Sequence, residues 1–318
     1  MKSSSHSELF ETPLPERSPS SFQDQILRRI CVQKPYNRLE NLAPFGGAGV
    51  AASVTFEAPV GLEAGYLASA EIGRHLAILG SCALARNNPS DERHYYLAHR
   101  ALLRRFTAPH VRQGEPLRLV AVPFEKDSAD VELRDHRDQV IASLSVDYRL
   151  LSGRLFARLF RAHFRDASAS SDAPSPYGTP VPFEGETHAV DSAHALLSEV
   201  TPALCAGHFQ EYPALPVAIL MDGINRLACA HLFRSTSKEI ALATCAVKAE
   251  QLAFAGESLQ FSVKRTFETH QSAIYHGSVT RASDGTVFGE AALSYEVSSG
   301  VRRAPSESGM MEIRRPRE

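Results

Sequence analysis

Two long apolar stretches, one in each half of the chain, dominate the pattern of hydrophobic positions. Residues 63–85 and 217–233 are apolar on nearly every face, so each predicts a helix buried inside the protein. A strand at 49–59 is expected before the first helix, and an early strand near 198–206 before the second. Because the order is the same in both halves, the chain is expected to hold two copies of one structural unit.

Each apolar helix is followed by runs in which apolar and polar residues alternate, the period of half-buried strands. The expected strands are 94–106, 116–126, 130–136 and 139–151 in the first half, and 239–254, 257–270, 271–282 and 286–297 in the second. A single helix wrapped by a curved antiparallel sheet leaves a sheet edge exposed, so the two units are expected to pair. The expected fold class is α+β.

Polar segments of low complexity separate these units. The predicted organisation is an N-terminal extension (1–36, with 1–20 disordered), a first unit (37–165), a Ser/Ala/Pro-rich linker (166–185), a second unit (186–300) and a basic tail (301–318). The Leu/Phe stripe of the basic amphipathic segment 152–166 is expected to pack on the protein rather than on a membrane.

Composition narrows the class of protein. The 318 residues are 43% hydrophobic and carry a net charge of −2, so a nucleic-acid partner is not expected. No apolar run reaches the roughly 20 residues of a membrane span, and the start lacks a secretory signal, so a cytoplasmic location is expected. The five cysteines lack zinc-ligand spacing and are expected to be reduced and buried. Neither a metal nor a cofactor is expected.

One motif carries candidate chemistry. His208-Phe209 is followed by Pro213, Pro216 and, fourteen residues after the histidine, Asp222. In the first half, Glu71 lies in an equally apolar helix, where a carboxylate is costly unless it is paired or functional. His75 follows one helical turn later. Aligning residues 70–77 with residues 221–228 places Glu71 on Asp222 as an internal repeat.

The motif resembles that of the β-hydroxyacyl-acyl-carrier-protein dehydratases, within the hotdog superfamily. There, His-Phe is followed by two prolines and then by Glu or Asp at the same distance. Two fused copies resemble the dehydratase domains of polyketide synthases, so the resemblance implies a double hotdog. It also implies that the histidine of one unit works with the carboxylate of the other, which makes His208 the base and Glu71 the acid.

The resemblance implies further roles around this pair. The backbone N–H of Val217, at a helix start, would polarise a thioester carbonyl. Phe209, Pro213 and Pro216 would line the substrate site, and His75 and Asp222 would support it. Counting fourteen residues back from Glu71 reaches Glu57, which cannot replace a histidine at neutral pH without a large shift of its pKa. One live site and one decayed site are therefore expected.

Two departures from the family pattern bear on activity. Val217 stands where the family has glycine, and Gln210, Glu211 and Tyr212 replace the family's Pro-Gly-His/Asp segment. The leading hypothesis is dehydration of a 3-hydroxyacyl thioester of an acyl-carrier protein or coenzyme A, in polyketide or specialised fatty-acid synthesis. The same carboxylate without the histidine would suit a hotdog thioesterase. Fused hotdogs would also suit a butyrolactone-synthase-like acyl transferase, or a decayed unit that binds an acyl carrier or a partner subunit. A homodimer of double-hotdog units is a further expectation.

Overall fold

The computed structural model describes residues 21–106, 111, 115–166 and 175–301. The predictions of disorder for residues 1–20 and of a solvated basic tail, together with part of the predicted linker (167–174), lie outside these residues. No helix among the described residues is both long enough and apolar enough to cross a membrane.

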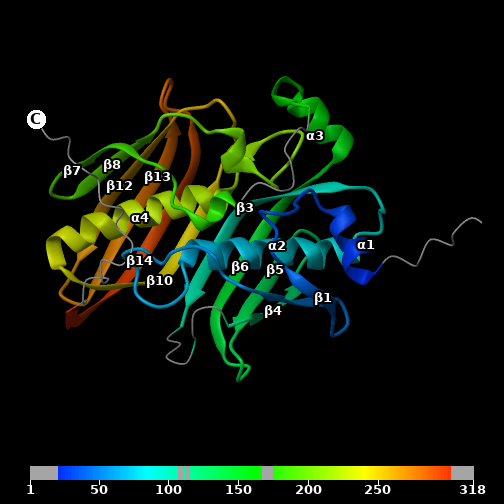
Figure 1. Cartoon of the computed structure of the whole chain (residues 1–318), viewed down its shortest axis with the longest axis horizontal. Coiled ribbons are helices and arrows are strands. Elements are labelled where there is room, and N and C mark those ends of the chain that lie inside the picture. Colours follow the sequence, from blue (N-terminus) through cyan, green and yellow to red (C-terminus); the bar gives the residue numbers. More distant parts are fainter. Residues whose placement is uncertain (1–20, 107–110, 112–114, 167–174, 302–318) are drawn as a thin grey trace, which may run out of the picture.

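A single twelve-stranded sheet, with every neighbouring pair antiparallel, forms one layer of the protein (Figure 1). The first half supplies β1 (Glu40–Phe45), β2 (Gly49–Val54), β3 (His94–Arg105), β4 (Leu117–Pro123), β5 (Ser128–Arg134) and β6 (Val140–Ser152). The second half supplies β7 (Glu184–His188), β8 (Ser192–Leu197), β10 (Lys238–Ala249), β12 (Leu259–Glu268), β13 (Ser272–Arg281) and β14 (Val287–Val301). The short strands β9 (Ala214–Leu215) and β11 (Ala253–Phe254) pair with each other.

The two halves repeat one topology. From the outer edge inward, the order is β1-β2-β4-β5-β6-β3 in the first half and β7-β8-β12-β13-β14-β10 in the second. They join along β3 and β10, where Arg104 lies opposite Thr244 and Arg100 opposite Lys248. Pairing at this edge covers the backbone groups that each unit alone would expose. The fold is therefore a double hotdog of class α+β, as the sequence predicted.

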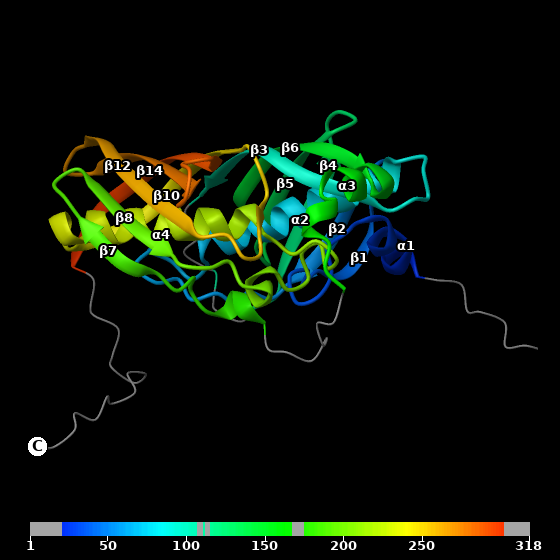
Figure 2. The same ribbon diagram turned by 90° about the horizontal axis from the view of Figure 1, so that it is seen from above.

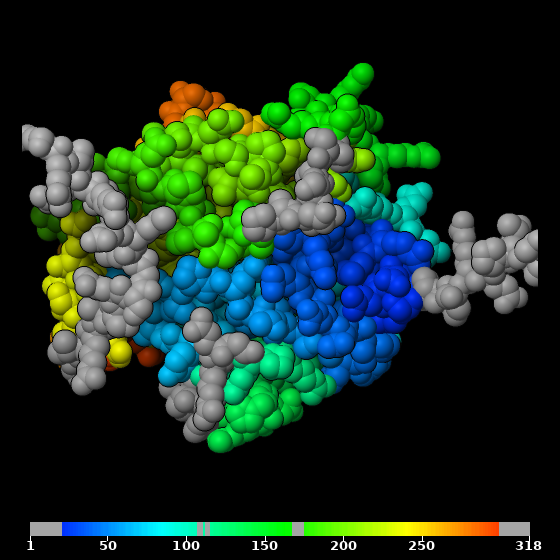
Figure 3. All heavy atoms as spheres, in the orientation of Figure 1, coloured from blue at the N-terminus to red at the C-terminus, as the bar shows by residue number. Residues whose placement is uncertain are grey.

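Two long helices form the second layer, on one face of the sheet (Figure 2). They are α2 (Ser69–Asn87) and α4 (Val217–Thr236). Fourteen of the nineteen residues of α2 are buried, which confirms the prediction from its apolar pattern. The space-filling view shows the blue residues that follow residue 20 and the green residues that follow residue 175 meeting over this layer (Figure 3).

The remaining helices are short. They are α1 (Phe22–Arg29), α3 (Gly153–Leu159) and the 3₁₀ turns η1 (Arg161–His163), η2 (Pro176–Gly178) and η3 (Pro202–Cys205). Helix α1 lies within the predicted extension, where a capping box on Ser21 and Asp24 starts it. In α3, buried Phe156 stacks on Tyr95 with ring centroids 3.6 Å apart, so this stripe packs on the protein as expected. All five cysteines are free and buried.

Two details of the sequence interpretation are wrong. The early strand expected near 198–206 ends at Leu197, because Pro202 begins η3 instead of continuing a ladder. The alignment of residues 70–77 with residues 221–228 is also displaced from the structural correspondence of the two helices. Tyr148 donates its hydroxyl hydrogen to the Ala77 carbonyl at 2.5 Å, and Tyr295, in the equivalent strand, donates to Asn225 at 2.8 Å.

Ala77 and Asn225 are therefore equivalent, in agreement with helices that begin at Ser69 and Val217. On this register Asp222 corresponds to Arg74, not to Glu71. The matching residues that suggested the alignment do not occupy equivalent positions on the two helices where these pack against the sheet.

Candidate active site

A cavity of about 630 Å³ is lined by both long helices and by strands β3, β6 and β10 of the sheet. On the α2 side it meets small residues, Ala70, Gly73 and Ala77, which leave room between the helix and the sheet. Leucines of the strands, among them Leu103 and Leu242, make much of the remaining wall apolar. A largely apolar pocket of this size suits an apolar ligand.

His208 lines this cavity from the loop between η3 and β9. The loop turns sharply at Gly207, with φ of +77°, and at Phe209, with φ of +54°. It is held against the N-terminal segment by the N–H of Gln33, which donates to the Gly207 carbonyl at 2.8 Å. A Cβ at residue 207 would lie 2.4 Å from the Gln33 carbonyl oxygen, so only glycine fits the turn.

The imidazole of His208 is set up as a base. Its Nδ1 lies 2.8 Å from the Ala214 carbonyl oxygen, which can only accept, so Nδ1 carries the hydrogen. Nε2 is then unprotonated and has no partner among the described residues. Burial lowers the pKa of His208 to about 4, so the ring is neutral at pH 7.

Tyr36 lies beside His208 and is a residue that sequence reasoning missed. The two rings are 5.0 Å apart, edge to face, and both line the cavity. Burial raises the pKa of Tyr36, so its hydroxyl stays protonated, and within the described chain no hydrogen bond commits that hydroxyl. The residue stands in the segment taken as an N-terminal extension, and no motif around it signals a role.

The start of α4 supplies backbone donors to the same cavity, through Val217 and Ala218. The N–H groups of Ile219 and Leu220 bond back to the Pro216 carbonyl, at 2.9 and 3.1 Å. The N–H groups of Val217 and Ala218 have no such partner in the part of the chain described. They stand at the positive end of the helix dipole, where developing negative charge is stabilised.

Of the other residues expected to line the substrate site, only Phe209 lines the main cavity, with its ring stacked on His208 at 3.8 Å. Pro216 is the N-cap of α4, and the Pro213 carbonyl accepts a hydrogen bond from the Ala255 N–H at 2.9 Å. These two prolines therefore shape the loop that carries His208, without being part of the cavity wall.

Glu71 lies on a different face of α2, beside a small cavity of about 40 Å³. Its carboxylate accepts the N–H groups of Glu57 and Ala58, each at 2.8 Å, and the guanidinium of Arg74 at 3.1 Å. Burial raises the pKa of Glu71, but the hydrogen bond from His75, the Arg74 charge and the backbone donor outweigh it, so the pKa lies below its usual value.

The structure does not bring Glu71 and His208 to one cavity wall. Neither cavity is lined by both residues. They are linked only indirectly, because the Tyr36 ring contacts His208 on one side and lies 5.8 Å from the Arg74 guanidinium carbon. Arg74 in turn binds Glu71.

His75 and Asp222, expected in supporting roles, both lie outside the main cavity. His75 Nε2 is 3.4 Å from Glu71, and burial lowers the pKa of His75 to about 4. Asp222 lines the small cavity together with Glu71, and no hydrogen bond to its carboxylate is found among the described residues. Burial raises the pKa of Asp222 to about 6.

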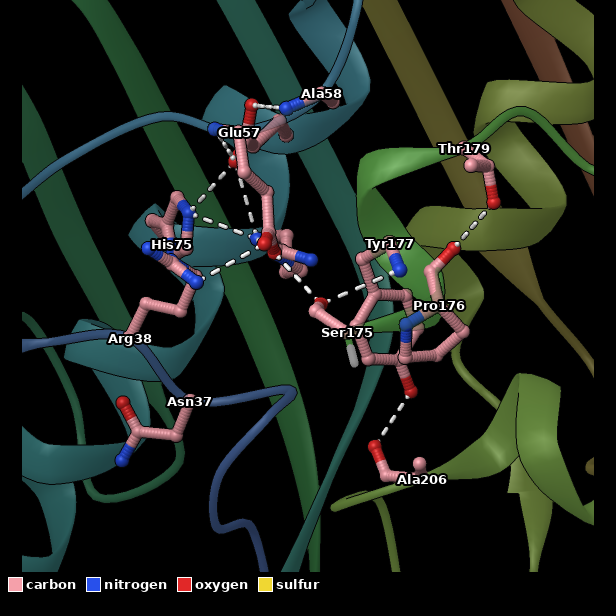
Figure 4. Close-up of polar contacts among 12 residues, drawn as sticks. Asn37, Arg38, Glu57, Ala58, His75, Ser175, Pro176, Tyr177, Thr179 and Ala206 are labelled. Atoms are coloured by element: carbon pink, nitrogen blue, oxygen red, sulfur yellow. Dashed lines mark hydrogen bonds and ion pairs between the residues drawn. The ribbon is translucent and has the colours of Figure 1, made fainter. Parts of the chain in front are cut away.

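Glu57, expected to be the relic of a second site, is an ion-pair centre (Figure 4). Its carboxylate binds Arg38 at 2.9 Å and Arg74 at 3.0 Å, and it accepts the hydroxyl of Ser175 at 3.0 Å. It thus ties the end of the linker to the first unit. The described residues hold no group of three or more His, Cys, Asp or Glu side chains suited to a metal ion.

No family model matches the chain, and no curated protein matches its sequence. Among solved structures, a tesB protein from Mycobacterium avium subspecies paratuberculosis is similar, with a TM-score of 0.53 and 12% identity, over 88% of this chain and 100% of that one. A conserved protein of unknown function with a hot dog fold from Alicyclobacillus acidocaldarius gives 0.50 and 15%, over 85% and 100%. At such identities these likenesses establish the shared double-hotdog fold.

Proposed function

We propose that this protein is an acyl-thioester hydrolase that holds the acyl chain in the main cavity and uses His208 as its base. One observation carries the proposal. A neutral imidazole with Nδ1 anchored on Ala214 and Nε2 uncommitted lines a largely apolar cavity that Tyr36 also lines. A coenzyme A or acyl-carrier thioester would supply the acyl group.

The chemistry follows from these groups. Nε2 of His208 removes a proton from a water molecule as the water oxygen adds to the thioester carbonyl carbon. The carbonyl oxygen becomes an oxyanion, which the N–H groups of Val217 and Ala218 and the hydroxyl of Tyr36 stabilise. The carbon–sulfur bond then breaks, His208 returns its proton to the departing sulfur, and the free acid and the thiol are the products.

Dehydration of a 3-hydroxyacyl thioester is the second candidate. The spacing of His208, Phe209, Pro213, Pro216 and Asp222 favours it. In that reaction Glu71 would be the acid, but its oxygens are occupied by two backbone N–H groups and by Arg74. Hydrolysis needs no second carboxyl group, so the geometry supports it better.

Product analysis separates the two reactions. Saturated acyl and 3-hydroxyacyl pantetheine thioesters are incubated with the protein and followed by mass spectrometry and by release of free thiol. We expect free thiol and free acid from both substrates. Loss of water from the 3-hydroxyacyl thioester without thiol release would contradict hydrolysis and establish dehydration. If neither substrate changes, the chain binds thioesters without transforming them or does not bind them at all.

A further inference from the structure

A buried polar cluster borders the cavity through Ser69 and Asn225. Its centre is Glu63, in the loop before α2, which is 3% exposed. The Glu63 carboxylate accepts the N–H of Ser69 at 3.2 Å and the side-chain amide of Asn225 at 3.1 Å. The hydroxyl of Ser69 and the guanidinium of Arg105 contact its other oxygen. Ser69 and Asn225, one from each half, line the cavity.

The amide of Asn225 has one orientation in this cluster. The Glu63 carboxylate is paired with Arg105 and accepts hydrogen bonds, so the amide nitrogen of Asn225 faces it. The amide oxygen accepts the Tyr295 hydroxyl at 2.8 Å and the Cys229 thiol at 3.7 Å. An amide nitrogen carries two hydrogens, and Glu63 receives one of them. The second has no partner within the described residues, and Asn225 is part of the cavity wall.

Three neighbouring hydroxyl groups of the cavity wall already have hydrogen-bond partners in the protein. The hydroxyl of Ser69 is bound to Glu63, that of Ser81 to the Ile78 carbonyl at 2.7 Å, and that of Tyr148 to the Ala77 carbonyl at 2.5 Å. Around Asn225 the wall is formed by Leu242, Leu293 and Cys245, whose thiol is only a weak donor. Asn225 therefore supplies the strong donor for a ligand in this part of the cavity.

The distance from the reaction centre follows from the helix. Asn225 lies eight residues after Val217 on α4, which at about 1.5 Å per residue is about 12 Å. An extended chain of roughly eight to ten carbons spans that length at a carbon–carbon distance of about 1.5 Å. Ala218 and Met221 of α4 line the cavity between the two positions, opposite Gly73 and Ala77 of α2.

We propose that Asn225 selects acyl chains that carry an oxygen atom, as a hydroxyl or a carbonyl group, at this distance from the thioester. The inference rests on the proposed function, because it takes the cavity as the acyl site. A terminal methyl group would leave the second N–H of Asn225 without water and without a hydrogen-bond partner, which is unfavourable. An oxygen of the ligand accepts that hydrogen and removes the cost.

Two ligands of equal length test this selection without requiring turnover. They are pantetheine analogues with an amide in place of the thioester, one bearing a 10-hydroxydecanoyl chain and one an undecanoyl chain. Titration calorimetry gives the Kd of each. We expect the wild-type protein to bind the hydroxylated analogue about tenfold more tightly, which corresponds to about 1.4 kcal/mol.

Variants assign the preference to Asn225. The double variant Asn225→Leu/Tyr295→Phe removes the amide and the hydroxyl that it accepts, so no polar partner is stranded between them. It is expected to bind the undecanoyl analogue at least as well as the hydroxylated one. Tyr295→Phe alone is the matched control, because Glu63 still holds the Asn225 amide, and it is expected to keep the preference.

The outcomes distinguish failure of the inference from failure of the proposed function. Equal binding of the two analogues by the wild-type protein overturns the inference and leaves the acyl cavity standing. The inference is also overturned if the double variant still prefers the hydroxylated analogue. If neither analogue binds, the cavity does not take acyl chains, and the proposed function falls together with the inference. The wild-type comparison depends on no variant.

Discussion

At the N-terminal end of α4, His208 and Tyr36 have complementary roles in the proposed reaction. His208 offers an unprotonated Nε2, and Tyr36 offers a hydroxyl hydrogen, since burial lowers the pKa of the first to about 4 and raises that of the second. They come from opposite halves of the chain, so the site exists only when the halves are assembled. Burial thus gives one group the role of proton acceptor and the other that of hydrogen-bond donor.

Removing the Tyr36 hydroxyl isolates its contribution. Tyr36→Phe keeps the ring against His208 and Tyr177 but removes one donor from the oxyanion. We expect kcat for thioester hydrolysis to fall about 10²-fold, the usual effect of one oxyanion donor, with little change in KM. Steady-state kinetics measure both constants. A fall in affinity with unchanged kcat would assign Tyr36 to substrate binding instead.

A substitution at Glu71 tests whether this residue has a structural or a catalytic role. In Glu71→Gln, an amide N–H₂ must replace an oxygen that accepts a backbone N–H or Arg74, so two donors face each other. We expect the free energy of unfolding to fall by about 3 kcal/mol, as when a buried ion pair is broken. Thiol release per folded molecule is expected to stay within a few fold. Complete loss of turnover in folded protein would show that Glu71 takes part in the reaction.

At the scale of single elements, the loop 206–216 decides where His208 points. Two residues with positive φ, Gly207 and Phe209, flank the histidine, and the N-terminal segment packs against them. The adjacent helix start then provides the free N–H groups. A short segment therefore carries both the proposed base and part of the proposed oxyanion site.

Two glycines with nearly the same backbone angle test this loop. Gly207 has φ of +77° and a Cβ there would meet the Gln33 carbonyl oxygen at 2.4 Å, whereas Gly285 has φ of +76° and open space around it. Both alanine variants suffer backbone strain of about 1 kcal/mol. Gly207→Ala is expected to lose at least about 1–2 kcal/mol more than Gly285→Ala, because the backbone must also shift. Urea unfolding measures the difference, and equal losses would mean that the N-terminal segment does not press on the loop.

At the scale of elements, the sequence predicted most of the fold. The buried helices and nine of the twelve strands of the large sheet follow from apolar runs and alternation, whose period depends only on local geometry. Strands β1 and β7 were missed, since their burial patterns are mostly exposed. The correspondence between the two helices was established from the hydrogen bonds of Tyr148 and Tyr295. These bonds join residues that are far apart in the sequence, so no local pattern predicts them.

The candidate site was predictable only in part, for the same reason. His208 was selected from the spacing of a motif, and Glu71 was selected as its partner because the family resemblance pairs the histidine of one unit with the helix carboxylate of the other. Tyr36 was not found because nothing in its own segment marks it. It reaches the site only through the packing of residues 30–37 on the loop of the other half, such as the bridge between Val32 and His208.

The whole molecule should lose stability in mild acid. His208 and His75 are both buried with a pKa of about 4, whereas the unfolded chain binds a proton on each near the ordinary value of about 6.5. Between about pH 6.5 and 4, the unfolded state therefore holds more protons, so the free energy of unfolding falls as the pH falls. Each histidine contributes about 1.4 kcal/mol per pH unit in this window.

Urea unfolding at pH 7 and pH 5 measures this dependence. The wild-type protein is expected to lose stability between the two values, because the two histidines outweigh the opposite effect of Asp222, whose pKa is raised to about 6 by burial. The double variant His75→Gln/His208→Gln is expected to lose clearly less. The same pH dependence in both proteins would mean that neither histidine is buried in its neutral form.

The most direct test of the account concerns His208 itself. Thiol release from a saturated acyl pantetheine thioester is compared between the wild-type protein and His208→Ala, with folding of both checked by circular dichroism. Because one general base contributes about 10²–10⁴ in rate, kcat/KM is predicted to fall by about a thousandfold. Hydrolysis that continues at the wild-type rate in folded His208→Ala would contradict the proposal that this imidazole is the base.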